Sequence, residues 1–241
     1  SDRTAMNTPS AELSESPTLV ETAYGQLRRD IIAGTRQPGE RLRIERLKAI
    51  YGIGPTPLRE ALQKLAQDGL VVTEGNRGFT VAPLDAAEFA DLNIARTAIE
   101  KEALRLSIAQ GDDGWESRVV AASYIMAKED AALAAADGGV PDAWERANEA
   151  FHGALVSASG SAWLLRVRAG LAAHCERYRR TSVYQRRRSR DLGAEHAQIA
   201  RAALARDAET ACALIERHFA LTATMLRDDA GSAPQADRPG A

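Results

Sequence analysis

Apolar residues recur at helical spacing in the first third of the chain. Every fourth position is apolar from Leu19 to Ile31, which predicts a helix over residues 19–33. The same spacing predicts short helices over 43–51 and 55–68, each followed by a glycine. Two short apolar runs over 70–73 and 79–82 then predict a β-hairpin. Three helices followed by a hairpin is the element order of a winged helix-turn-helix.

From Leu84 onward the pattern is helical throughout, and aspartates (Asp85, Asp112 or Asp113, Asp142 and Asp207) stand at expected N-caps. We expect six helices, over about 85–110, 113–136, 141–158, 161–181, 188–205 and 208–228. The fold class is therefore mainly α, with a winged helix-turn-helix domain over 17–83 and an all-α six-helix bundle over 84–229. The polar ends, 1–16 and 230–241, are predicted to be disordered tails.

Composition narrows the classes of protein that fit this pattern. The 241 residues are 45% hydrophobic and 27% charged, with a formal net charge of -2, so any nucleic-acid site must be local. No apolar run approaches the roughly 20 residues that span a bilayer, and we see no secretory signal. Cys175 and Cys212 both fall in helical patterns, which suits a reducing compartment and predicts a cytoplasmic protein without a membrane partner.

Four segments in the N-terminal region resemble the signature of the GntR family of transcriptional regulators. They are PGERL at 38–42, GIGPTPLREAL at 52–62, DGLV at 68–71 and GFTV at 78–81. The resemblance implies a winged helix whose third helix enters the major groove of double-stranded DNA. The family usually has Ser-Arg before Thr56, where this chain has Gly54 and Pro55, so its operator sequence is not inferred from relatives.

We expect DNA contacts from the third helix, the second helix and the wing, namely from Thr56, Pro57, Arg59, Arg43, Arg46, Arg77 and Gly78. Arg59 can reach a guanine edge from the N-terminal end of its helix. The alternative is that Arg59 pairs with Glu60 or Glu45 on a solvated face.

Three histidines are predicted to converge in the helical region. Asn148 and His152 are four residues apart and share a helix face, and His196 and His218 lie on apolar faces of the last two helices. His196 precedes Asp207, at the expected turn, by 11 residues and His218 follows it by 11, which returns both imidazoles to one level. Such a set suits a divalent metal, whereas a single inward histidine is usually a hydrogen-bonded core residue.

The segments RTAIE at 96–100, NEAFH at 148–152, EHAQI at 195–199 and RH at 217–218 resemble the FCD sensor domain of the FadR subfamily. Six helices indicate its VanR-like branch. The resemblance implies that Asn148, His152, His196 and His218 bind a divalent metal such as Zn, Ni or Mn. The family usually has Asp at position 148, and because Asn brings no charge we expect weaker or less selective metal binding, or none.

Arg96 lies on an apolar helix stripe, so its guanidinium should be partly buried and needs a partner. That partner is either Glu100, one turn on, or the carboxylate of an effector above the metal. Arg177 and Tyr178 are further candidates for facing the effector cavity.

The sequence predicts a homodimeric repressor of a catabolic operon and no enzyme. It would bind a palindromic operator and be released by a small organic acid that prefers one of two states. One alternative is a DNA-binding dimer whose bundle only dimerises, without an effector. Another is a metallohydrolase built on the three histidines, for which Glu149 turns about 100° away from the ligand face.

Overall fold

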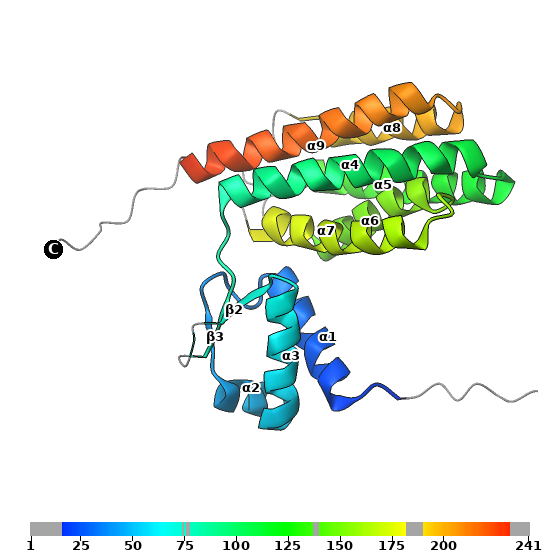
Figure 1. Ribbon diagram of the computed structural model, residues 1–241. Coiled ribbons are helices and arrows are strands. Elements are labelled where there is room, and N and C mark those ends of the chain that lie inside the picture. The colour runs from blue at the N-terminus through cyan, green and yellow to red at the C-terminus, as the bar shows by residue number, and fades with distance from the viewer. Residues whose placement is uncertain (1–15, 74, 76–77, 137–139, 182–189, 232–241) are drawn as a thin grey trace, which may run out of the picture. The chain divides into compact units, whose positions relative to one another are not determined.

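The computed structural model describes residues 16–73, 75, 78–136, 140–181 and 190–231 (Figure 1). These residues form two compact units. One comprises the chain up to Arg29 together with Arg41–Thr80, and the other comprises Asp30–Glu40 and everything from Val81 onward. Nearly all of both expected tails, and Arg77 of the wing, lie outside the described residues.

The N-terminal elements match the predicted order, with one addition. The helices are α1 (Leu19–Ile32), α2 (Ile44–Tyr51) and α3 (Pro55–Gln67), and the strands are β1 (Arg41–Leu42), β2 (Val71–Thr73) and β3 (Phe79–Val81). Strand β1, which the sequence did not predict, pairs antiparallel with β3 and makes a three-stranded sheet of order β1-β3-β2. Two residues are too short a run to give a periodic signal, so only the pairing defines this strand.

Local signals position α3, the expected recognition helix. Gly52 adopts a left-handed conformation with φ of 67° and ends α2, and Pro55 opens α3, where its missing N–H costs no hydrogen bond. Leu58, Leu62 and Leu65 are fully buried at helical spacing. The opposite face of α3 stays in solvent, which leaves Thr56 and Arg59 exposed.

The second unit contains α4 (Ala86–Gln110), α5 (Asp113–Ala135), α6 (Asp142–Val156), α7 (Ala162–Thr181), α8 (Leu192–Leu204) and α9 (Ala208–Gly231). Helix α4 packs against α9, α7 and α6, and α5 packs against α6 and α8 (Figure 1). The predicted mainly α fold is therefore confirmed. Within the described residues, no helix has the length and apolarity needed to cross a membrane.

Three of the predicted aspartate caps are present. Asp85, Asp112 and Asp207 each accept a backbone N–H in the first turn of a helix. Asp142 is the first residue of α6 rather than its cap, because Pro141 stands at the N-cap and makes no side-chain cap bond. The core is built around buried aromatic side chains of α5 and α6, including Trp115, Trp144 and Phe151. Among the buried polar side chains are three histidines, and these form the candidate site.

Candidate metal centre and nucleic-acid interface

His152 of α6, His196 of α8 and His218 of α9 meet inside the helical unit, as their spacing predicts. All three are buried, and one nitrogen of each lies within 4.8 Å of those of the other two. Their ring centroids are 4.9 to 5.8 Å apart. Three imidazoles at this separation can share one divalent cation.

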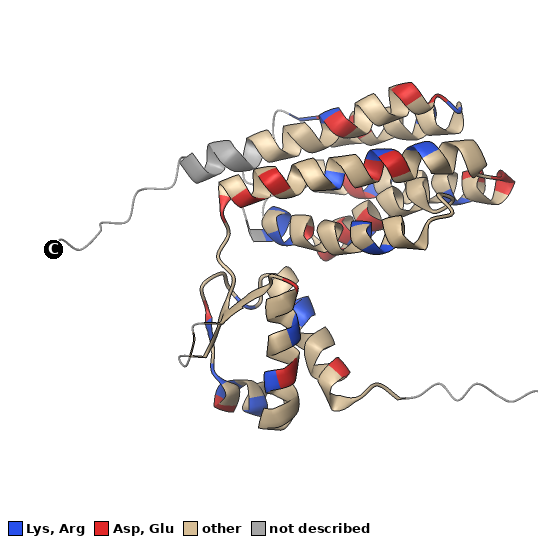
Figure 2. Ribbon diagram, in the orientation of Figure 1, with Lys and Arg blue, Asp and Glu red and all other residues tan. Residues whose placement is uncertain are grey.

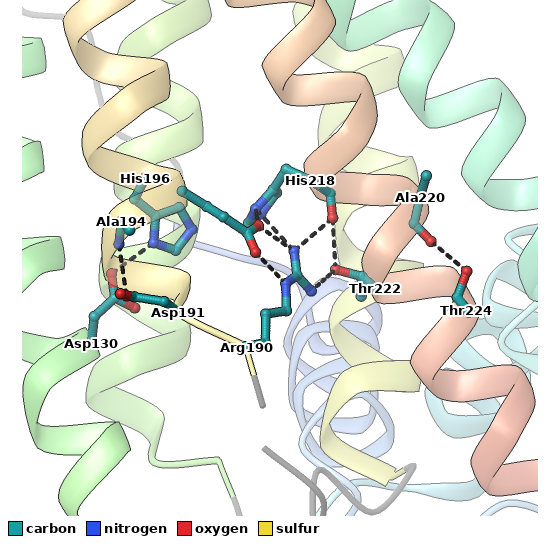
Figure 3. Close-up of polar contacts among 10 residues, drawn as sticks. Asp130, Arg190, Asp191, Ala194, His196, His218, Ala220, Thr222 and Thr224 are labelled. Carbon is teal, nitrogen blue, oxygen red and sulfur yellow. Dashed lines mark hydrogen bonds and ion pairs between the residues drawn. The ribbon is translucent and has the colours of Figure 1, made fainter. Parts of the chain in front are cut away.

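Carboxylates hold two of these rings in place (Figure 3). Nδ1 of His196 lies 2.7 Å from Oδ2 of Asp130, a residue of α5. Nδ1 of His218 lies 2.8 Å from Oε2 of Glu195, which also accepts two hydrogen bonds from Arg190. An ionised carboxylate only accepts, so each Nδ1 carries the proton and each Nε2 keeps its lone pair.

Burial keeps the imidazoles of His152 and His218 neutral. Desolvation, helped by the charges of neighbouring His218 and Arg96, holds the pKa of His152 well below its ordinary value. Desolvation likewise lowers the pKa of His218 to about 3, although the bond to Glu195 opposes the change. Burial by itself would raise the pKa of Glu195, but the bonds from Arg190 and His218 outweigh it and bring that pKa to about 2. Neutral imidazole is the form that binds metal, so His152 and His218 are in the metal-binding form at neutral pH.

Behind His152 lies a buried ion pair between two other helices. Glu100 of α4 and Arg168 of α7 approach to 3.0 Å, and Arg168 also binds the half-exposed Glu149 at 2.7 Å. Nδ1 of His152 is 3.8 Å from Glu100, too far for a hydrogen bond. The alternative in which Glu100 pairs with Arg96 is therefore not what the structure shows, because Glu100 faces Arg168.

Arg96 and Asn148 line one cavity with His152 and His218. Arg96 is 3% exposed, and its guanidinium lies 4.3 Å from the centroid of the Phe219 ring. Its Nε and Nη2 are buried without a hydrogen-bond partner among the described residues. A buried guanidinium whose donors face a cavity beside three histidines can receive an anion.

The expectation that Arg177 and Tyr178 face this cavity is wrong. Helix α7 presents Cys175 and Arg179 to it, since these two residues are one turn apart and share a face. Arg177 instead donates to the carbonyl of Ala82, and the Tyr178 hydroxyl donates to Glu88 at 2.7 Å. Arg177 therefore binds the segment that leads into α4, and Tyr178 binds the first turn of α4.

The residues present fit a divalent metal. Nε2 of His196 and both ring nitrogens of His152 are buried without a hydrogen-bond partner in the described part of the chain. Leaving such nitrogens without a partner is costly, and coordination would satisfy them. Asn148 is buried in the same cavity and offers an amide oxygen as a fourth, uncharged ligand.

Of the predicted DNA contacts that the structure describes, all but the half-buried Pro57 are exposed on the N-terminal unit. Arg43 and Gly78 line one surface depression with Arg59 and with Arg41, which the sequence analysis did not single out. Lys and Arg gather on and beside α2 (Figure 2). Arg59 makes no ion pair with Glu45 or Glu60 among the described residues. Thr56, Pro57 and Arg46 lie outside this depression, with Thr56 and Arg46 exposed.

Sequence reasoning missed Asp130, although a signal for it exists. Val119, Met126 and Leu133 are buried on one face of α5, and Asp130 falls on the same stripe. A carboxylate on an apolar stripe must find a buried donor, here the indole of Trp144 and the ring of His196. Arg168 gives no such signal, because its partners come from α4 and α6.

Comparison with family models agrees with both resemblances. Residues 19–81 match the model described as bacterial regulatory proteins, gntR family, and residues 91–221 match the FCD domain. The matched ranges coincide with the winged helix and with most of the helical bundle.

Relatives are similar over nearly the whole chain. The HTH-type transcriptional regulator BphR of Paraburkholderia xenovorans is 38% identical over 87% of this chain and 85% of the relative. The HTH-type transcriptional repressor GlaR of Escherichia coli K12 is 36% identical over 81% and 90%. A GntR regulator of known structure from Rhodococcus sp. RHA1 is 26% identical, with a TM-score of 0.71 over 89% of this chain and 98% of that one.

Proposed function

Because this chain belongs to the GntR family of bacterial regulatory proteins and carries an FCD domain, it is a DNA-binding transcriptional regulator, and we propose that it is a metal-dependent, homodimeric repressor released by a small organic acid. Its relatives are regulators and not enzymes, so the metallohydrolase alternative is set aside. The similarity to GlaR, which is described as a transcriptional repressor, favours repression over activation.

The buried Arg96 guanidinium carries the effector proposal. It lies in one cavity with the three-histidine cluster, and two of its nitrogens lack a partner among the described residues. A carboxylate has the charge and the planar pair of oxygens that a guanidinium binds best. An organic acid would therefore satisfy Arg96 through one carboxylate.

The proposed metal ligands are His152, His196, His218 and the amide oxygen of Asn148. When bound, a divalent cation would supply a positive charge and open coordination positions for an oxygen of the effector. Arg96 orients the acid, and the apolar wall of Phe89 and Phe219 excludes water from the cavity. Because all four direct ligands are uncharged, the positive charge of a bound cation would not be neutralised, and the site would favour an anionic effector.

On the DNA side, we propose that Arg59 reads a base edge from the N-terminal end of α3. Arg43, Arg46 and Arg77 would bind phosphates, and the backbone of Gly78 would approach the minor groove. Two copies related by a twofold axis would bind a palindromic operator. The effector changes operator affinity only by binding the two states of the protein unequally.

Thermal stability with added acids tests the effector proposal. The full chain is melted with a panel of mono-, di- and tricarboxylates, with and without ZnCl2, alongside Arg96→Gln and the exposed-site control Arg105→Gln. We expect a stabilising acid whose effect requires zinc and is lost only in Arg96→Gln. If no acid changes the melting temperature of the unsubstituted chain, the bundle acts without a carboxylate effector. That result would favour the alternative in which the bundle only dimerises.

Selection from a random DNA duplex library tests the regulator proposal. The full chain should enrich a palindrome. Arg59→Ala should lose its preference at one defined base pair, a loss of about 1–3 kcal/mol in the binding free energy that discriminates between bases there. Lys64→Ala, an exposed change toward the other end of α3, is the matched control. Addition of the stabilising acid should release the palindrome. Enrichment of a single unrepeated half-site would refute the dimeric mode.

A further inference from the structure

Asp130 is the buried carboxylate that contacts the histidine cluster from α5. It is 6% exposed, and each of its oxygens has a defined partner. Oδ1 accepts from the indole Nε1 of Trp144 at 2.8 Å, and Oδ2 lies 2.7 Å from Nδ1 of His196. No backbone cap or loop explains this residue, since it stands within a helix whose other inward residues are apolar.

Asp130 differs from the other carboxylates around the cluster in its charge balance. Glu195 is paired with Arg190, and Glu100 is paired with Arg168. In the part of the chain that the structure describes, Asp130 has no Arg or Lys partner, and its ion-pair neighbour is His196. Its negative charge is therefore available to the cluster.

We propose that Asp130 is the positioning residue that makes His196 a metal ligand and that it supplies the buried negative charge which Asn148 does not. The inference rests on the proposed metal centre and deepens it. The carboxylate holds the proton on Nδ1 of His196, so that Nε2, which is buried and has no hydrogen-bond partner, presents its lone pair to the cation. The charge acts from behind a ligand rather than as a ligand.

Replacing the Asp130 carboxylate by an amide tests whether it fixes the tautomer of His196. Indole Nε1–H is a donor only, and the Nδ1–H of His196 is a donor as well, so Asp130 satisfies both with its two acceptor oxygens. In Asp130→Asn only one oxygen remains. If it stays with Trp144, the amide NH2 faces Nδ1, which can accept only when the imidazole proton moves to Nε2. That tautomer has no lone pair for the metal.

The experiment measures zinc affinity of the full chain by competition with a chromophoric chelator. We expect Asp130→Asn to bind zinc about 10- to 100-fold more weakly than the unsubstituted chain. The matched control is Asp191→Asn, which removes a nearby exposed carboxylate. Its side chain caps α8 at Ala194, a role that Asn also fills, so zinc affinity should not change.

A second variant and a second readout guard against a merely misfolded protein. In Asp130→Asn with Trp144→Phe, the amide oxygen is free to accept from Nδ1, and part of the lost zinc affinity should return. Nitrogen-15 NMR of the metal-free chain should show the proton of His196 on Nδ1 in the unsubstituted protein and on Nε2 in Asp130→Asn.

The outcomes distinguish failure of the proposed metal centre from failure of the proposed role of Asp130. If the unsubstituted chain binds no zinc, the metal centre is refuted and the role of Asp130 falls with it. If the unsubstituted chain binds zinc and Asp130→Asn binds it equally well, the metal centre stands and the role of Asp130 is overturned. An unchanged His196 tautomer in Asp130→Asn would likewise overturn it.

Discussion

The Glu100–Arg168 pair offers a sharp test of how the helical unit is held together. The perturbation is Arg168→Met, which keeps the alkyl volume and removes the guanidinium. Glu100 is 1% exposed, and burial raises its pKa even with Arg168 present. Breaking a buried pair by removing one partner typically costs about 3–5 kcal/mol, because the other charge is left without compensation. At about 2–4 °C per kcal/mol for a domain of this size, the melting temperature should fall by about 10 °C.

The free energy of unfolding is measured by urea unfolding of the full chain and the melting temperature by heating it, both followed by tryptophan fluorescence. Trp115, Trp144 and Trp163 all belong to the helical unit, so the signal reports that unit. The matched control is Arg166→Met, an exposed guanidinium over the Trp163 ring, whose loss should cost less than about 1 kcal/mol.

Two further measurements test the reasoning. Glu100→Met combined with Arg168→Met should recover most of the stability, because an apolar pair needs no charge compensation. The deficit of the single variant should also grow as the pH rises, because a group with a raised pKa contributes stability below its ordinary pKa and loses it above. A deficit equal to that of Arg166→Met, or one that persists unchanged in the double variant, would show that Glu100 is not a buried charge held by Arg168.

Three further predictions follow from the same structure. Zinc at 100 times its dissociation constant should stabilise the chain by about 2.7 kcal/mol, EDTA should reverse this, and His196→Ala should show no such gain in the same thermal melt. Without metal, the free energy of unfolding should fall as the pH drops below about 6.5. The folded-state pKa values of His152 and His218 are lowered, so the stability they contribute is present above the pKa of an unfolded histidine and is lost in acid. A free energy of unfolding that does not change with pH in urea titrations would contradict the burial of these rings. Gly52→Ala should destabilise the N-terminal unit by about 1 kcal/mol because φ is 67° there, whereas Gly54→Ala, at φ -64°, should cost less in circular-dichroism melts.

The overall architecture could be predicted from the chain because its signals are local. Glycines, prolines and aspartates end or cap most helices within the turn where they stand, and apolar spacing marks the buried faces. The shared level of His196 and His218 also followed from counting along two helices from Asp207. Strand β1 was missed because two residues carry no periodicity, and Asp142 was misplaced because Pro141 takes the cap.

What the tertiary structure decided is which side chains from different helices share the interior. The partner of Arg168 is Glu100, 68 positions away, and the partner of His196 is Asp130, 66 positions away. Helical periodicity tells which face turns inward but not which neighbour it meets or at what height. The same limit explains Arg177 and Tyr178, since both are buried and yet contact the start of α4 and the segment before it rather than the cavity. Sequence alone therefore determined the elements, their order and the inward histidines, whereas the charge balance around those histidines depends on contacts that only the packed helices create.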